Sequence, residues 1–335
     1  MCQRPKRLPR ARHVARCLHP SALRCVTIAR LKGDPAVMPT TLADLNEAPA
    51  TEFVAVLGAV FEHAPWVAEA TAAQRPFGTV EALFAAMRRA VEGAPDARRQ
   101  ALLANHPELA GRAARSGDIA PNSIAEQAAA GLDRLSETEA ARFAALNAAY
   151  RDKFGLPFIL CVKRHGRTSL LASFEARLAA SPEEEQRTAE AEVMRIAAIR
   201  LNALVTGAGP LSTTGRISTH VLDTVQGKPA AGVAVTLVEF ISDTDIAVVA
   251  RAVTNADGRT DAPLIHGRPV PRATYELRFA LGDHFRRIGP ALGLDLPEPP
   301  FLDVVPLRFG VGDPEGHYHV PLVATPWSYQ TYRGS

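Results

Sequence analysis

The chain has few of the features that mark disulfide-bonded, zinc-binding or membrane-spanning proteins. It holds four cysteines in 335 residues, and no two form a CxxC pair, so neither a disulfide framework nor a cysteine zinc site is indicated. It contains no run of about eighteen apolar residues, the length that a membrane-spanning helix needs. The first residues also lack the continuous apolar stretch of a secretory signal. These absences favour a globular protein of a reducing compartment, and we expect a bacterial cytoplasmic location.

Outside the first residues, the chain has no strong excess of positive or negative charge. The net charge is +3, and residues 1–33 carry nine Lys or Arg and no acid, which leaves the rest of the chain mildly acidic. No basic face therefore remains to bind nucleic acid. The Arg-rich leader over residues 1–38 is typical of an organelle transit peptide or a nucleic-acid-binding arm. We favour a third interpretation, an upstream start codon with the protein beginning near Met38, because periodic structure starts only at residues 41–44.

Two hydrophobic patterns divide the remainder of the chain. Residues 41–206 have the spacing of helices, whereas residues 216–335 alternate in polarity as strands do. The Gly- and Thr-containing segment 207–215 between them is typical of a linker. At 47% apolar residues, each part is long enough to bury its own core. The sequence therefore predicts a multidomain fold, an all-α N-terminal helical bundle followed by an all-β C-terminal sandwich.

Helix ends are clearly marked in the N-terminal part. Residues 136–139 (Ser-Glu-Thr-Glu) form a capping box, and the helix that follows is expected to end at Gly155. Ser181, followed by Pro182 and three Glu, opens another helix that runs to about Val205. Residues 158–162 lie between these helices and are expected to be extended and buried.

Short strands are expected in the C-terminal part. One of them presents Val233, Val235 and Leu237 on a single face. Gly, Pro and Asp turns separate further strands, which we place at residues 247–254, 275–281, 301–309 and 317–325. Together these strands predict a β-sandwich of about 120 residues.

Three segments of the C-terminal part and its final residues carry the strongest functional signal. They are Ser-Thr-His-Val-Leu-Asp at 218–223, Thr-Asn-Ala-Asp-Gly-Arg at 254–259, His-Tyr-His-Val-Pro-Leu at 317–322 and Tyr-Arg-Gly-Ser at 332–335. Over residues 215–335 the chain resembles the 5-hydroxyisourate hydrolases, the enzymatic branch of the transthyretin-like family. Transthyretin itself, a hormone carrier, lacks both the histidines and that ending.

This resemblance implies that His220, Arg259 and His319 are catalytic. Hydrolysis of a ring amide adds water to a carbonyl and develops an oxyanion, and a neutral histidine and an arginine suit these two tasks. We expect the histidines to activate water and move protons, and Arg259 to bind the anion. The resemblance also implies a substrate pocket completed by the end of the chain, at Tyr332, Arg333, Gly334 and Ser335.

Each of these residues also has a structural interpretation. His317 and His319 are two apart, so a strand points both to one face, and with His220 they would make a three-histidine zinc site. Packing is the simpler role for His317. A lone arginine in a turn, as Arg259 is, is usually solvated. Tyr332, near a terminus, would fray unless something such as another subunit pins it.

Three segments of the helical part carry a second signal. They are Asn-His-Pro-Glu-Leu at 105–109, Ser-Ile-Ala-Glu-Gln at 123–127 and Lys-Phe-Gly-Leu-Pro-Phe-Ile at 153–159. A residue before proline avoids the helical region, so His106 is expected at the start of a helix, with its ring projecting into a cleft. Over residues 42–205 these segments resemble the 2-oxo-4-hydroxy-4-carboxy-5-ureidoimidazoline (OHCU) decarboxylases.

By this resemblance His106 is the catalytic acid/base, Glu126 is its partner and Arg200 is a substrate clamp. Further residues are expected to line the substrate pocket, namely Pro107, Ser123, Gln127 and the backbone of residues 158–162, among them Phe158, Ile159 and Val162. The sequence holds no metal, flavin or pyridoxal motif, and we expect no cofactor. The reaction requires none, because an imine-like group beside the carboxylate accepts the electron pair left by carbon dioxide.

The helical site residues have structural alternatives as well. Ser123 and Glu126 fit the capping-box pattern. Arg200 falls on the apolar stripe of its helix, where an unpaired guanidinium costs on the order of 3 kcal/mol or more, so either a substrate anion or a structural acid must meet it. His165, in a loop of charged residues, is expected to be solvated.

The two resemblances together imply a bifunctional enzyme of urate degradation, which hydrolyses 5-hydroxyisourate to OHCU and decarboxylates OHCU to (S)-allantoin. The expected partners are these small molecules, with no nucleic acid and no membrane. A homo-oligomer is also implied, a tetramer through the β-domain with a dimer through the helical domain as an option. Two alternatives remain: only one domain is catalytic, or the β-domain is a transthyretin-like carrier or oligomerisation module.

Overall fold

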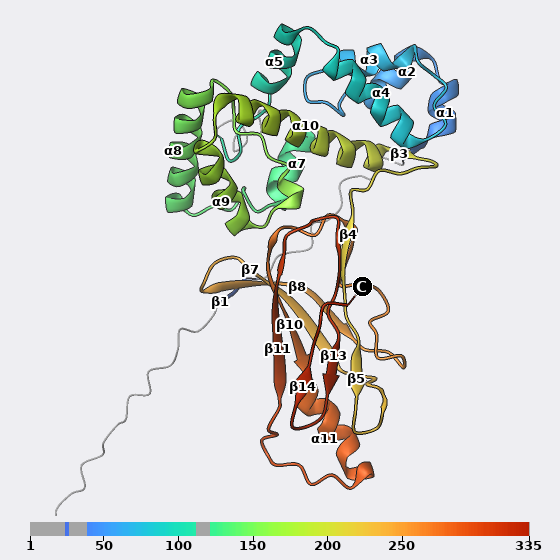
Figure 1. Ribbon diagram of the computed structural model, residues 1–335, viewed down its shortest axis with the longest axis vertical. Helices are drawn as coiled ribbons and strands as arrows, with labels where there is room; N and C mark the ends of the chain where they lie inside the picture. Colours follow the sequence, from blue (N-terminus) through green and yellow to red (C-terminus); the bar gives the residue numbers. More distant parts are fainter. Residues whose placement is uncertain (1–23, 27–38, 112–120, 335) are drawn as a thin grey trace, which may run out of the picture.

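The chain folds into a helical part followed by a β part. The computed structural model describes residues 24–26, 39–111 and 121–334, so the leader predicted over residues 1–38 lies almost wholly outside the described residues. Figure 1 shows the helices at one end, the strands at the other, and the chain around β3 and β4 passing between them. Among the helices of these ranges, none has the length and apolarity to cross a bilayer. The predicted fold class is confirmed.

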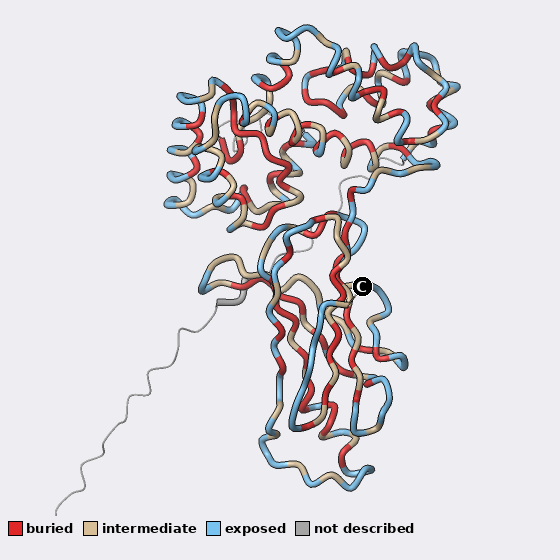
Figure 2. Tube along the Cα trace, in the orientation of Figure 1, coloured by how far each residue is buried: buried red, intermediate tan, exposed pale blue. Residues whose placement is uncertain are grey.

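The helical part is built on the long helix α10. Its elements are α1 (Leu42–Glu47), α2 (Ala50–Leu57), α3 (Trp66–Ala72), α4 (Val80–Glu92), α5 (Asp96–Ala104), α7 (Pro121–Ala129), α8 (Glu137–Phe154), the 3-10 turn η1 (Val162–Arg164), α9 (Arg167–Leu178) and α10 (Pro182–Leu204). One apolar core joins α1–α5 to α10, and a second lies between α8, α9 and residues 158–162. Figure 2 shows these buried stretches in the interior of the helical part.

The predicted helix ends are confirmed. Ser136 and Ser181 each accept a hydrogen bond from the backbone N–H of the third helical residue, and the glutamate there accepts one from the backbone N–H of the cap residue. Gly155 ends α8 in the left-handed region, at φ 68°, which a residue with a Cβ adopts only at a cost. Residues 158–161 are buried, as expected, and form no regular element before η1.

The β part is a sandwich. Its elements are β4 (Gly215–Ser218), β5 (Val221–Asp223), β6 (Lys228–Pro229), β7 (Ala234–Phe240), β8 (Asp245–Val253), β9 (Ile265–Arg268), β10 (Ala273–Ala280), β11 (Val304–Val311), β12 (His317–His319), β13 (Leu322–Ala324) and β14 (Tyr329–Gln330). One sheet has the order β1-β8-β7-β10-β11, in which β1 is Arg24–Val26. Opposite it lie the sheets β12-β4-β9 and β14-β13-β5-β6. Strands β2 (Thr40–Thr41) and β3 (Val205–Thr206) pair with each other beside the helices.

A helix, α11 (Leu281–Leu292), interrupts the predicted run of strands. Leu281 was expected to end a strand, but it begins this helix. Leu281 and Phe285 are buried on the face that packs on the sandwich, and Ile288 packs against the same core. The signal was the spacing of these three residues, at i, i+4 and i+7. Two glycines and Pro290 inside the segment hid it, because they disfavour helix in sequence reasoning.

Candidate active sites

A cavity in the helical part gathers most of the residues predicted there. Its volume is about 370 Å³, including the space at its mouth, and its wall is formed by His106, Pro107, Leu109, Ser123, Glu126, Gln127, Leu160, Cys161, Val162, Lys163, Ile196 and Ile199. These residues come from the end of α5, from α7, from the segment before α9 and from α10. The residue classes that proton transfer needs, imidazole and carboxylate, therefore meet in one partly enclosed space.

Arg200 lies beside this cavity and binds two acids. Its Nη1 is 2.7 Å from Oε2 of Glu62, and its Nη2 is 2.9 Å from Oε2 of Glu126. Nη2 also donates to Oγ of Ser123, which donates to the Glu62 carboxylate. The Arg200 side chain is only 4% exposed, as its position on the apolar stripe of the helix predicted. The two carboxylates compensate its buried charge. Of the two expected partners, a substrate anion or a structural acid, the structure shows structural acids paired with Arg200.

Glu62 is a site residue that sequence reasoning missed. It is 4% exposed and lies between α2 and α3, next to buried Phe61. Burial alone would raise the pKa of Glu62, but the charge and hydrogen bond of Arg200 hold it below the ordinary value. The signal was present, since an acid inside the apolar run 60–68 must find a partner, as Arg200 must.

His106 was expected at the start of a helix, but it follows the end of α5. Asn105 is the C-cap of α5 and Pro107 follows His106, so the helix precedes the His-Pro pair and does not start from it. Burial lowers the pKa of His106 to about 4, although the Glu62 carboxylate opposes the shift. Its Nδ1 is buried without a hydrogen-bond partner among the described residues. The ring is therefore neutral near pH 7 and can accept a proton.

Residues 158–162 divide between the core and the cavity wall. Phe158 stacks on Phe174, with ring centroids 3.8 Å apart, and Ile159 is fully buried in the core, so neither lines the cavity. Val162 does, together with Leu160 and Cys161 of the same predicted stretch. Side chains of one extended stretch divide between core and cavity, and the sequence did not show which point where.

The alternative capping role of Ser123 is wrong. Ser123 lies inside α7, two residues after Pro121 begins it, and its hydroxyl is directed to Glu62. Gln127, one turn further along, receives the backbone N–H of Ala110 on its Oε1 and donates to the carbonyl of Glu108. These bonds fasten the loop after His106 to α7.

In the sandwich, His220 and His319 lie in direct contact. Nδ1 of His220 is 2.7 Å from Nε2 of His319, and Nδ1 of His319 is 2.9 Å from Oγ of Ser218. Nε2 of His317 lies 2.9 Å from the same hydroxyl, so the two histidines of β12 share a face, as their spacing predicts. Ser218 was not predicted as a site residue, although it begins the motif at residues 218–223 that contains His220.

Arg259 stands next to the histidine pair. Its backbone bridges that of His220, and its side chain is exposed at the surface. Burial lowers the pKa of His220, and the Arg259 charge adds to the shift. Burial also lowers the pKa of His319 to about 4, with further contributions from His220 and Arg259. Both rings are therefore held neutral beside an exposed guanidinium.

The end of the chain closes on His319. The Gly334 N–H donates to the His319 carbonyl at 2.9 Å, and a Cβ on Gly334 would stand 2.6 Å from Cδ2 of the ring. The Arg333 guanidinium lies over the Tyr318 ring at 5.2 Å. Tyr332 is 57% exposed and is not gathered with the histidines, while Ser335 lies outside the described residues. The terminus is thus pinned by its own chain, at Gly334.

The three-histidine zinc alternative finds no support. Nε2 of His319 is engaged by Nδ1 of His220, and Nε2 of His317 is turned to Ser218. Over residues 24–26, 39–111 and 121–334, no three His, Cys, Asp or Glu side chains are grouped as metal ligands.

Comparison with known proteins divides the chain in the same way as its folds do. A family model for OHCU decarboxylase matches residues 46–202, and a model for the HIUase/transthyretin family matches residues 217–334. The 5-hydroxyisourate hydrolase of Deinococcus radiodurans is 59% identical over 119 residues, which are 36% of this chain and 95% of that protein. The 2-oxo-4-hydroxy-4-carboxy-5-ureidoimidazoline decarboxylase of Haloferax volcanii is 41% identical over 161 residues, which are 48% of this chain and 94% of that protein.

Among solved structures, that of an (S)-allantoin synthase is 34% identical and covers 88% of this chain and all of that one, with a TM-score of 0.49. The two family models and the two sequence relatives together define a fused protein. The chain belongs to the OHCU decarboxylase family in its helical part and to the HIUase/transthyretin family in its β part.

Proposed function

We propose that this chain is a bifunctional enzyme of urate degradation that converts 5-hydroxyisourate to OHCU in the sandwich and OHCU to (S)-allantoin in the helical part. The observation that carries the proposal is the presence of two separate sites, each with a neutral buried histidine beside a guanidinium. The coverage of 95% of a hydrolase and 94% of a decarboxylase by one chain supports it.

In the sandwich, His220 and His319 act together as the base. One ring takes a proton from water, the hydroxide adds to a ring carbonyl, and the exposed Arg259 stabilises the oxyanion. The carbon–nitrogen bond then breaks, the carbonyl carbon becomes the carboxylate of OHCU, and the proton passes to the departing nitrogen. Gly334 and Arg333 close the site from the chain end.

In the helical part, the proton moves through His106. The carbon–carbon bond to the carboxylate breaks, carbon dioxide leaves, and the electron pair moves into the neighbouring carbon–nitrogen double bond, whose nitrogen takes a proton from water. The neutral His106 ring takes the proton of the 4-hydroxyl and returns it to one face of the adjacent ring carbon, which fixes the handedness of the product. Arg200 holds Glu126 and Glu62 in place. Lys163, in the cavity wall with its Nζ 3.5 Å from Oε1 of Glu126, supplies positive charge for the substrate carboxylate.

The test follows both steps in one reaction. Urate and urate oxidase generate 5-hydroxyisourate, and ultraviolet absorbance and circular dichroism follow its loss and the appearance of chiral allantoin. With the wild-type protein we expect both rates to rise above the spontaneous ones and the (S) product to form. His106→Ala should abolish the second effect only, and His220→Ala the first only. Spontaneous rates and a racemic product with the wild-type protein would refute the proposal.

We further propose that the protein works as a homo-oligomer assembled through the sandwich. Large apolar side chains remain exposed there in the single chain, among them Phe301 at 69% and Trp327 at 52%. Sedimentation or native mass spectrometry should show a tetramer, and Trp327→Glu should reduce its mass. A wild-type monomer would contradict this assignment.

A further inference from the structure

The segment from Val162 to Gly166 stands between the decarboxylase cavity and the sandwich. Val162 and Lys163 line the cavity. Arg164, His165 and Gly166, the next residues, contact the sandwich instead. Figure 1 shows α9, which this segment precedes, at the end of the helical part that faces the strands. The beginning of this short segment therefore lines the cavity, and its end contacts the sandwich.

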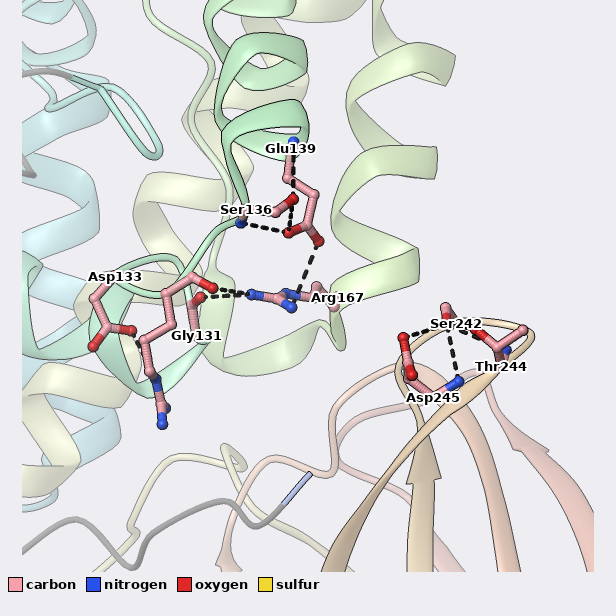
Figure 3. Close-up of polar contacts among 9 residues, drawn as sticks. Gly131, Asp133, Ser136, Glu139, Arg167, Ser242, Thr244 and Asp245 are labelled. Carbon is pink, nitrogen blue, oxygen red and sulfur yellow. Dashed lines mark hydrogen bonds and ion pairs between the residues drawn. The ribbon is translucent and has the colours of Figure 1, made fainter. Parts of the chain in front are cut away.

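Backbone hydrogen bonds join the segment to the sandwich. The N–H of Gly166 donates to the Arg272 carbonyl at 3.0 Å, and the N–H of Arg272 donates to the Arg164 carbonyl at 2.8 Å. His165 and Arg272 thereby form a parallel β-bridge between the two parts of the chain. Figure 3 shows two nearby groups of contacts, each within one part of the chain: those of Arg167 at the start of α9, and those of the β7–β8 turn around Ser242.

A half-buried ion pair reinforces these bonds. Nη2 of Arg164 lies 2.9 Å from Oε2 of Glu315, and the two side chains are 14% and 18% exposed. Glu315 lies in the turn between β11 and β12, directly before the strand that carries His317 and His319. The pair thus connects a residue adjoining Lys163 in one site to a residue near the histidines of the other.

The fit of the segment leaves no spare room. His165 was expected to be solvated, but it is only 6% exposed. Its Nδ1 lies 3.2 Å from Oγ of Ser169, and burial lowers its pKa to about 4. A Cβ on Gly166 would overlap Oε1 of Glu239 and stand 2.9 Å from Cβ of Ala273. The φ of Gly166 is −79°, so close approach and not backbone conformation requires glycine there.

We propose that residues 162–166 form a docking segment through which the sandwich holds one wall of the decarboxylase cavity. Arg164, Gly166 and Glu315 are then positioning residues for OHCU decarboxylation, although none of them lines the cavity. Lys163 depends on them because it lines the cavity and directly precedes Arg164 in the chain. The kinetic part of this proposal rests on the proposed function, whereas the contact itself does not.

The first test fills the space at Gly166 in the full-length protein. Serine is a good helix N-cap, so Gly166→Ser should act through the clash with β7 and β10 and leave the start of α9 intact. We expect the KM for OHCU to rise about fivefold or more, kcat to stay within about twofold, and hydrogen exchange over residues 161–166 and at Arg272 to speed up. Gly78→Ser, where no atom lies within 4 Å, is the matched control and should behave as the wild type.

The second test exchanges the charges of the ion pair. Arg164→Glu and Glu315→Arg should each raise the KM for OHCU and speed exchange over the segment, and the double variant should recover most of both effects. The proposal is overturned if Gly166→Ser exchanges like the wild type, or if the two charge variants simply add in the double variant. A wild-type protein that does not turn over OHCU would instead refute the proposed function, and the exchange measurements would still decide whether the segment docks.

Discussion

Nδ1 of His220 lies 2.7 Å from Nε2 of His319, so one ring donates and the other accepts, and a single proton is shared between them. Ser218, at Nδ1 of His319, helps to select which nitrogen carries the proton. Because burial and the Arg259 charge keep both rings neutral, the pair has room for one proton taken from water. This geometry favours the pair, and not one histidine, as the base that we propose for the hydrolase site.

Loss of the Ser218 hydroxyl should impair hydrolysis without affecting decarboxylation. Ser218→Ala removes the group that orients His319, and a hydrogen bond of this kind contributes about 1.5 kcal/mol, so we expect kcat for 5-hydroxyisourate to fall about tenfold. Stopped-flow absorbance measures it. Ser328→Ala, in the exposed turn before β14, is the control. Equal rates for the two variants would mean that Ser218 does not orient the pair.

The acid limb of decarboxylation should lie near pH 4. Burial lowers the pKa of His106 to that value, and the active form is the neutral ring, so activity is present above about pH 4 and is lost as the pH falls through it. The pH dependence of kcat/KM for OHCU reports this pKa in the free enzyme. A limb near pH 6.5, the ordinary value for histidine, would show that the base is a solvated group.

A methyl group at position 334 should disturb hydrolysis. In Gly334→Ala the added Cβ would stand 2.6 Å from Cδ2 of His319, so either the ring or the chain end must move. We expect kcat for 5-hydroxyisourate to fall at least about tenfold, which corresponds to about 1.4 kcal/mol, with decarboxylation unchanged. Gly310→Ala, in β11 with no atom within 4 Å, should have wild-type rates. A fully active Gly334→Ala would remove the chain end from the site.

The sequence was sufficient for the elements whose signals are local. Ser136, Ser181 and Gly155 mark their helix ends as predicted, because caps and left-handed glycines act through their immediate neighbours. Arg200 was also found from the sequence, since a charge on an apolar stripe needs a partner. The identity of that partner was not available locally. Glu62 lies 138 positions away in the chain, and only the folded structure brings it to Arg200.

Other surroundings that the sequence did not predict have the same origin, in contacts between distant parts of the chain. His165 has the composition of a surface loop, yet it is buried, because a second domain covers it and no local pattern reports that. The motif predicted that the backbone of Phe158 lines the pocket, but it did not indicate that the ring stacks on Phe174 of α9. The motifs named residues that the fold gathers around one cavity and one histidine pair, whereas long-range packing decided which side chains face the cavity.

Acid should destabilise the folded protein between about pH 6.5 and pH 4. The pKa values of His106, His165 and His319 are lowered to about 4, so below pH 6.5 the unfolded chain binds protons that the folded chain does not. Glu239 acts in the opposite direction, because burial raises its pKa to about 7, but it is one group against three. Urea unfolding at pH 7, 6 and 5 should give a falling free energy of unfolding, and His165→Gln should flatten the fall. An increase with acid would contradict these assignments.

Neutralising Glu62 should impair decarboxylation in two separable ways. Glu62→Gln keeps the shape but removes the charge that pairs with Arg200, and a charged hydrogen bond contributes about 1.5 to 3 kcal/mol, so kcat/KM for OHCU should fall at least about tenfold. The Glu62 charge also raises the pKa of His106, so its loss should move the acid limb to lower pH. A residue that only maintained the fold would leave that limb in place. Glu69→Gln, exposed on α3, is the control, and a Glu62→Gln protein with wild-type rate and pH profile would exclude Glu62 from the site.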